Sequence, residues 1–110
     1  MARRRTRTGA ADAPVTTVVV MCLYVAGKAP NSVKAIANLR AICRRYLKDG
    51  GYKLEIVDVF EHPRRALADG VVVTPSLAKV SPGPASNVIG NLSDTGSVLA
   101  ALGLHAGDLN

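Results

Sequence analysis

Residues 15–25 read Val-Thr-Thr-Val-Val-Val-Met-Cys-Leu-Tyr-Val, an apolar and mostly β-branched stretch that contains no charge. Such a stretch is typical of a central strand that other elements cover on both faces. Gly27 and Pro30 end the predicted strand. The rest of the domain is therefore expected to pack around residues 15–25.

A helix is expected next, with Asn31 or Ser32 as its N-cap and Asp49-Gly50-Gly51 at its end. Its apolar residues recur at helical spacing and are expected to face the sheet: Val33, Ile36, Leu39, Cys43 and Tyr46. Residues 52–60 then supply a second strand. Two strands that flank one helix of this length form a right-handed βαβ unit, so the first half of the chain is predicted to be α/β.

The second half of the chain carries patterns that compete with one another. His62-Pro63 opens a short helix through Leu67 that Asp69-Gly70 closes, yet residues 71–73 immediately favour a strand. Two short strands and a last helix complete the chain: residues 77–80, residues 88–92, and a helix from Ser93 or Asp94 to about Leu104. The most economical element order is βαβαββα.

Composition is typical of one small globular domain. The 110 residues can bury one core, and 48% hydrophobic with 20% charged residues is far from the composition of disordered chains. Most of the net charge of +6 comes from Arg3, Arg4, Arg5 and Arg7, because residues 15–110 hold ten Lys or Arg against seven Asp or Glu. We therefore expect a disordered basic arm over residues 1–14 and a single domain over residues 15–110.

The two cysteines indicate a reducing compartment. Cys22 falls in the first strand and Cys43 in the helix stripe, which suits buried thiols. A basic stretch before an apolar run can be mistaken for a signal peptide, but its removal would delete the best strand, so a cytoplasmic protein is expected. The sequence contains no transmembrane span and no metal-ligand spacing. We therefore expect no membrane association and no metal or other cofactor.

The order βαβαββα, with Thr74-Pro75 just before the third strand, resembles the thioredoxin fold. The resemblance implies a cis bond at Thr74-Pro75, although a base rate of about 5% favours trans on sequence alone. Thioredoxins carry Cys-x-x-Cys after the first strand, because dithiol exchange needs two neighbouring thiols. Here that turn reads Gly27-Lys28-Ala29-Pro30-Asn31-Ser32, so this redox chemistry is not expected.

Five blocks of residues resemble the KaiB family more specifically, and the match spans about residues 18–102. The blocks are Leu23-Tyr24-Val25-Ala26-Gly27, Pro30-Asn31-Ser32-Val33, Ile56-Val57-Asp58-Val59, Thr74-Pro75-Ser76-Leu77-Ala78-Lys79-Val80 and Ile89-Gly90-Asn91-Leu92-Ser93. The resemblance implies a non-catalytic circadian clock protein that binds a KaiC-like ATPase and modulates its phosphorylation or signalling state.

The resemblance also implies fold switching between two structures of one sequence. A thioredoxin-like monomer binds the ATPase, whereas a tetramer with the order βαββααβ forms when the C-terminal half refolds. Other implied partners are KaiA, a sensor histidine kinase with a KaiB-like domain, and further copies of this chain as a dimer or tetramer.

Site residues follow from the resemblance. The residues expected to contact KaiC or other clock partners are Lys34, Tyr52, Lys53, Leu54 and Lys79. The residues expected in the switching half are Thr74, Pro75, Pro82, Pro84, Gly90 and Asn91. Gly90 interrupts a strand pattern, which suggests a left-handed or bulged backbone in at least one state. The resemblance suggests that the tetramer is the state that needs this glycine.

Departures from the family pattern favour a divergent member. Ser86 and Asn87 stand where the family usually has two arginines, Asn91 where it has Asp, and Cys22 where a basic residue is common. Lost positive charge beside the switching segment is expected to alter partner affinity or choice. A reduced system with a KaiC homologue alone is therefore favoured at least as much as a KaiA-containing oscillator.

Two other functions are weaker alternatives. A thioredoxin- or glutathione-transferase-like enzyme would need a poised Cys or Ser at the start of the first helix, where Ser32 is the sole candidate. A nucleic-acid binder would rely on the arginine arm, since aromatic residues are only 4% of the chain. His62 and His105 have no ligand or nucleophile spacing, and Asp58 is expected to bind backbone at a strand end.

Overall fold

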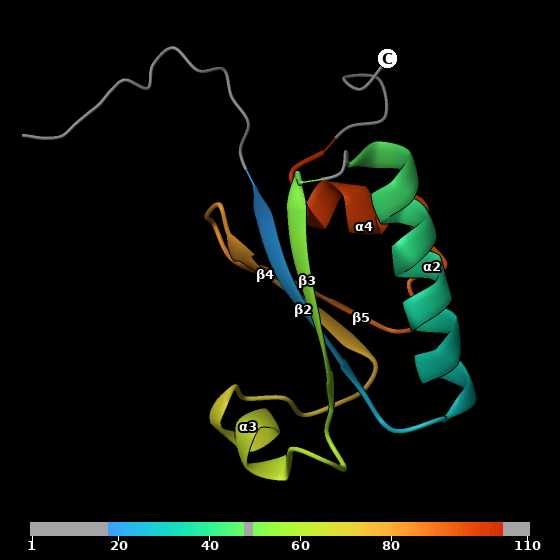
Figure 1. Ribbon diagram of the computed structural model, residues 1–110, viewed down its shortest axis with the longest axis vertical. Coiled ribbons are helices and arrows are strands. Elements are labelled where there is room, and N and C mark those ends of the chain that lie inside the picture. The colour runs from blue at the N-terminus through green and yellow to red at the C-terminus, as the bar shows by residue number, and fades with distance from the viewer. Residues whose placement is uncertain (1–17, 48–49, 105–110) are drawn as a thin grey trace, which may run out of the picture.

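A computed structural model describes residues 18–47 and 50–104. The expected basic arm, residues 15–17 of the first strand and His105 lie outside these residues. The elements, in chain order, are β2 Val19–Val25, α2 Pro30–Tyr46, β3 Tyr52–Asp58, α3 Pro63–Ala68, β4 Ser76–Ser81, β5 Ser86–Ile89 and α4 Thr95–Ala101 (Figure 1). This order is the predicted βαβαββα.

The four strands form one mixed sheet in the order β3-β2-β4-β5. β2 pairs in parallel with β3, and Val19 lies opposite Tyr52. β4 runs antiparallel to β2, and β5 returns antiparallel to β4 as a hairpin. β2 is therefore a central strand, as its uncharged sequence predicts, while β3 and β5 form the two edges.

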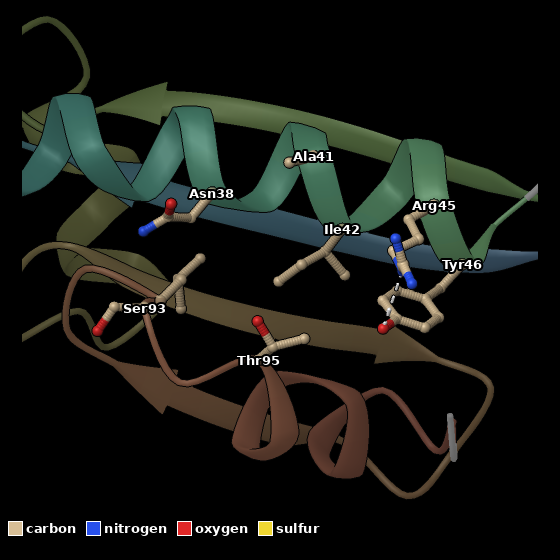
Figure 2. A pocket seen from close by; sticks show the side chains of 8 residues that line it. Asn38, Ala41, Ile42, Arg45, Tyr46, Ser93 and Thr95 are labelled. Atoms are coloured by element: carbon tan, nitrogen blue, oxygen red, sulfur yellow. Dashed lines mark hydrogen bonds between the residues drawn. The ribbon is translucent and has the colours of Figure 1, made fainter. Parts of the chain in front are cut away.

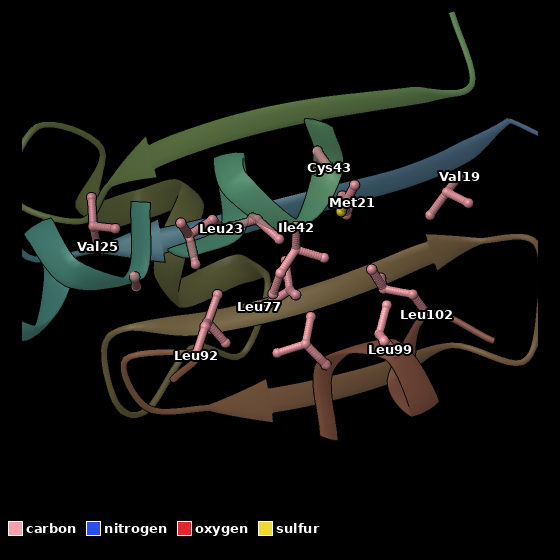
Figure 3. Close-up of a cluster of buried hydrophobic side chains, with 13 residues drawn as sticks. Val19, Met21, Leu23, Val25, Ile42, Cys43, Leu77, Leu92, Leu99 and Leu102 are labelled. Carbon is pink, nitrogen blue, oxygen red and sulfur yellow. The ribbon is translucent and has the colours of Figure 1, made fainter. Parts of the chain in front are cut away.

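α2 and α4 cover one face of the sheet (Figure 1). Alternate residues of β2 point toward these helices, and Met21, Leu23, Leu39, Leu77 and Val98 are almost completely buried between them (Figure 3). Because side chains alternate along a strand, the remaining residues of β2 point to the opposite face. There Cys22, Tyr24 and Val57 form a smaller cluster beside the short helix α3. The main core thus lies on the α2 and α4 side.

The N-cap of α2 lies two residues before Asn31 and three before Ser32, the two predicted caps. It is Ala29, without a side-chain hydrogen bond, and Pro30 occupies the first turn, where its missing N–H costs no intrahelical bond. The predicted apolar stripe is also rotated. Val33 is 52% exposed, and the buried positions are Ser32, Ala35, Leu39, Ile42 and Cys43. The small side chains of Ser32 and Ala35 let the helix lie close to the sheet.

Of the two competing patterns in the second half of the chain, the helix forms as α3, and residues 71–73 form no strand. The Val71 N–H donates to the Ala66 carbonyl at 3.0 Å and closes the helix, while Val72 is 91% exposed. The last helix ends at Ala101 rather than Leu104, and Asp94 is its N-cap, accepting from the Ser97 N–H. In the described residues, no helix combines the length and apolar character needed to cross a membrane.

Candidate partner-binding and switch sites

Two side chains stabilise the turn after β2 by accepting hydrogen bonds from backbone N–H groups. Asp58 Oδ1 accepts from the backbone N–H of Gly27 at 3.1 Å and from that of Phe60 at 2.9 Å, which confirms the strand-end interpretation of this carboxylate. Ser32 Oγ accepts from the Ala26 N–H at 2.9 Å. Since Ser32 is only 1% exposed, its hydroxyl supports the turn and is not presented to a substrate.

The two thiols are buried and free, as predicted. Cys22 belongs to the small cluster on the α3 side, whereas Cys43 lies in the main core under α2. Burial raises the pKa of both thiols, that of Cys43 to about 11. Both groups are therefore protonated at neutral pH, and neither has the thiolate character of a redox-active cysteine.

The predicted partner contacts are spread over the molecule. Lys34 is exposed near the start of α2, and Lys53 is exposed near the start of the edge strand β3. Tyr52 and Leu54, beside Lys53, are partly buried against the core. β3 begins opposite the start of β2, while α2 begins after the end of β2, so Lys34 and Lys53 lie toward opposite ends of the sheet.

Lys79 is buried, at 6% exposure, and does not offer a surface contact in this fold. It points to the same face of β4 as Leu77, toward the C-terminal end of α4. Its Nζ is 3.8 Å from the position that a Cβ atom on Gly103 would take. The Lys79 ammonium therefore lies beside the residues that follow α4, and in this fold it is not accessible for the partner contact that the resemblance implies.

Four of the predicted switch residues come together at one end of the sheet. The bonds Thr74-Pro75, Ser81-Pro82 and Gly83-Pro84 are cis, the first as the thioredoxin resemblance implies. The Gly90 N–H donates to the Pro75 carbonyl at 2.9 Å. Two hydrogen bonds fix the neighbouring Asn91. Its backbone carbonyl accepts from Asn38 Nδ2 at 2.8 Å, and its Oδ1 accepts from the Ser93 N–H at 3.0 Å.

Pro82 and Pro84 are separate from this group. They lie in the loop between β4 and β5, beyond the last residue of β4 at Ser81. Thr74, Pro75, Gly90 and Asn91 instead flank the opposite ends of the same two strands. The predicted switch residues therefore bracket the β4–β5 hairpin.

Gly90 has a φ of +115°, which confirms the expectation of an unusual backbone at this position. The structure does not support the tetramer as the one state that needs the glycine. The thioredoxin-like fold itself uses a φ that side-chain-bearing residues rarely adopt.

Sequence reasoning missed a polar network that ties α3 to the sheet. Arg65 binds both carboxylate oxygens of Glu55 at 2.7 Å and reaches Asp69 at 3.1 Å, and the Tyr24 hydroxyl donates to Asp69 at 2.7 Å. These hydrogen bonds lower the pKa of Glu55 and of Asp69. The Arg65 and Asp69 pair has helical i, i+4 spacing, which was the one available indication in the sequence.

Together, the element order βαβαββα and the sheet order β3-β2-β4-β5 define a thioredoxin-fold protein, and its turn before α2 contains no Cys-x-x-Cys dithiol. Solved structures agree with this fold. The N-terminal domain of Synechococcus elongatus SasA has a TM-score of 0.66 at 21% identity, covering 86% of this chain and 92% of that one. Chloroplastic thioredoxin z has a TM-score of 0.66 at 17% identity, covering 78% and 76%.

The chain belongs to the KaiB family, whose KaiB domain matches residues 22–104. The circadian clock oscillator protein KaiB of Trichodesmium erythraeum is 40% identical over 97 residues, which cover 88% of this chain and 92% of the relative. The protein of the same name from Thermostichus vulcanus is 44% identical over 92 residues, 84% of each chain. The family resemblance inferred from the five sequence blocks is thus confirmed.

Proposed function

We propose that this chain is a non-catalytic clock regulator that binds a KaiC-like ATPase in the cytoplasm and modulates its phosphorylation or signalling state. The observation that carries the proposal is the KaiB domain match over residues 22–104, which includes nearly every element of the thioredoxin-like fold. The relatives are circadian clock oscillator proteins. The buried Ser32 hydroxyl and the protonated, buried thiols favour binding over catalysis.

The proposed contacts lie at two places, Lys34 at the start of α2 and the group Tyr52, Lys53 and Leu54 at the start of β3, toward the opposite end of the sheet. Lys34 and Lys53 are exposed cations, suited to carboxylates on a partner. β3 is an edge strand, so one row of its backbone N–H and C=O groups is not used by β2 and can pair with an added strand. Lys79 is left out of these contacts because it is buried.

We further propose that the β4–β5 hairpin and its flanks exchange between this fold and a βαββααβ tetramer. The residues that would change their surroundings are Thr74, Pro75, Pro82, Pro84, Gly90 and Asn91. Supporting this, the hairpin contacts the rest of the sheet through β2 alone, since β5 is an edge. Self-association and binding to KaiA or to a sensor histidine kinase with a KaiB-like domain belong to the same proposal.

A co-precipitation assay with a KaiC-like ATPase, with and without ATP, tests the function. We expect the ATPase to be retained, and Lys53→Ala and Lys34→Ala each to weaken the complex about fivefold or more. Arg64→Ala is the matched control, because Arg64 is an exposed cation on α3, outside the proposed contacts. Failure to retain the ATPase under both conditions would refute the proposal, and equal losses for all three variants would refute the contacts.

A further inference from the structure

The positive charge of the described domain is concentrated on α2. Between Pro30 and Tyr46 the helix carries four cations and no carboxylate: Lys34, Arg40, Arg44 and Arg45. All four are exposed. The ion pairs formed among residues 18–47 and 50–104 all belong to Arg65 on the other side of the sheet, so the cations of α2 are not neutralised there.

Helix electrostatics account for only part of this pattern. Arg44 and Arg45 lie in the last turn, where the helix dipole favours cations, whereas Arg40 lies a turn earlier. Lys34 is eleven positions before Arg45, about 16 Å along the helix axis at 1.5 Å per residue. The cluster at the C-terminal half of α2 is thus separate from the Lys34 contact proposed above.

A hollow of mixed polar and apolar lining adjoins Arg45 of this basic cluster. Its volume is about 290 Å³, and it lies between α2 and the segment that leads from β5 into α4 (Figure 2). Ala41, Ile42 and Leu92 supply apolar surface, while Ser93 and Thr95 place hydroxyls on the wall opposite α2. Arg45 stands at one end over the Tyr46 ring, 5.5 Å from its centroid, and its Nε donates to the Tyr46 hydroxyl at 3.2 Å.

The geometry points to a second docking surface, made of the C-terminal half of α2 and this hollow, that binds an acidic segment of a protein partner. A partner carboxylate pairs with Arg45, with Arg44 and Arg40 adding attraction, and an apolar side chain enters the hollow. The stacking on Tyr46 and the Nε hydrogen bond hold the guanidinium in place, so it loses little freedom on binding.

The observations favour a protein over the other anionic partners. Proteins that bind single-stranded nucleic acid combine cations with aromatic side chains on which the bases stack, and Tyr46 is the single aromatic side chain that lines the hollow. A membrane surface would require exposed apolar side chains next to the cations. In the C-terminal half of α2, the exposed positions other than arginine are Ala37 and Ala41.

The hollow also makes binding depend on the fold. One wall comes from α2 and the other from Leu92, Ser93 and Thr95, which follow the β4–β5 hairpin. An occupant that contacts both walls binds only when the C-terminal segment packs on α2 as it does here. Such a partner would stabilise the thioredoxin-like fold by mass action.

The test uses the full chain and a synthetic peptide of about twelve residues built from Glu-Glu-Leu repeats, at about 0.15 M salt so that distant charges are screened. Binding is followed by backbone NMR shifts and by titration. We expect shifts at Asn38, Ile42, Ser93 and Thr95, and a loss of about fivefold or more in affinity for Arg45→Gln. Ala41→Phe, which fills the hollow from an exposed helix position, should weaken binding similarly. Arg64→Gln is the control and should leave affinity unchanged.

Two matched peptides and two other probes complete the test. Replacing Glu by Gln should abolish binding, and replacing Leu by Ser should weaken it, because the hollow would lose its occupant. Equal affinity for the Ser peptide, or equal losses for Arg45→Gln and Arg64→Gln, would overturn the proposal. It would also be overturned if single-stranded DNA or phosphatidylserine vesicles bound through Arg45 more tightly than the peptide. The test involves no ATPase, so its outcome is independent of the function proposed above.

Discussion

The backbone of Gly90 allows a single-residue test of the fold. Nothing lies within 4 Å of the position that a Cβ atom would take, so the cost of Gly90→Ala comes from its φ of +115° alone. We expect the free energy of unfolding of the thioredoxin-like form to fall by about 1 kcal/mol or more. Faster partner association, which would follow if only the tetramer needed the glycine, is not expected.

Thermal unfolding of Gly90→Ala measures this cost, with Gly96→Ala as the control. Gly96 lies in the first turn of α4, and a Cβ there would meet Asp94 Oδ1 at an ordinary 3.5 Å. Alanine should therefore leave stability unchanged or raise it by up to about 1 kcal/mol. An unchanged melting temperature for Gly90→Ala would show that the backbone at this position is not constrained.

Cys43 gives a prediction about pH. Burial raises the pKa of its thiol from 9.0 to about 11 in the folded state. The folded state thus holds this proton more tightly than the unfolded state, and its contribution to stability is present below pH 9 and lost as the pH rises toward 11. Denaturant melts of wild type and Cys43→Ala at several pH values would test this, since the variant should lose the part of the pH dependence that Cys43 contributes and keep the part from Cys22, whose pKa is also raised.

Replacing both Cys22 and Cys43 tests the prediction that the protein has no redox chemistry. Cys22→Ser combined with Cys43→Ser should leave ATPase binding intact, because neither thiol lies in the turn before α2. Stability should fall by about 1–3 kcal/mol when a hydroxyl replaces a buried thiol without a partner. Disulfide reductase activity in wild type that disappears in the double variant would contradict a non-catalytic protein.

At the scale of elements, α3 depends on its polar network. Arg65 and Glu55 are 44% and 56% exposed, so their pair should add little to global stability, and the effect of Glu55→Gln should be local. We expect faster hydrogen exchange of the α3 amides with a nearly unchanged melting temperature. Glu61→Gln, an exposed carboxylate just before α3, is the control. Equal exchange rates in all three proteins would show that the network does not hold α3.

Low pH should also speed the hydrogen exchange of the α3 amides. The hydrogen bonds lower the folded-state pKa values of Glu55 and Asp69 below their ordinary values of 4.5 and 3.8. Their contribution is therefore present above those ordinary values and is lost as the pH falls through the lower folded-state values. The acid sensitivity of α3 exchange should disappear in Glu55→Gln combined with Asp69→Asn.

The elements also show how far the sequence predicts this fold. The uncharged run before Gly27 identified the central strand, and the element order was correct because apolar periodicity and turn residues agree in most segments. The buried face of α2 was predicted with the wrong rotation because Ser32 is buried. Its hydroxyl accepts a hydrogen bond from the Ala26 N–H, and the spacing of apolar residues does not indicate such a contact. Residues 71–73 were predicted as a strand because they are three β-branched valines. They form no strand because β-branched residues also occur in loops, and no neighbouring strand pairs with this segment.

Site residues were harder to predict than elements, because their roles depend on tertiary contacts. Lys79 was expected as a partner contact because of the KaiB resemblance, whereas the packing of the domain leaves it only 6% exposed. The hollow beside Arg45 likewise depends on Leu92 and Thr95, which are distant from α2 in the sequence. The five sequence blocks identified the family but did not indicate which of their residues would be accessible.

At the scale of the whole molecule, the main core is built from residues Val19 to Leu102. Removing residues 1–12 should therefore leave the melting temperature nearly unchanged while it lowers the net charge from +6 to +3, since four arginines and one aspartate are lost. An Arg-rich segment with no periodic apolar face has little to bury on folding. Binding of the acidic peptide to α2 should persist in the truncated chain, because Arg40, Arg44 and Arg45 remain. A large loss of thermal stability would instead show that the arm docks on the domain, and a loss of peptide binding would place the acidic site on the arm rather than on α2.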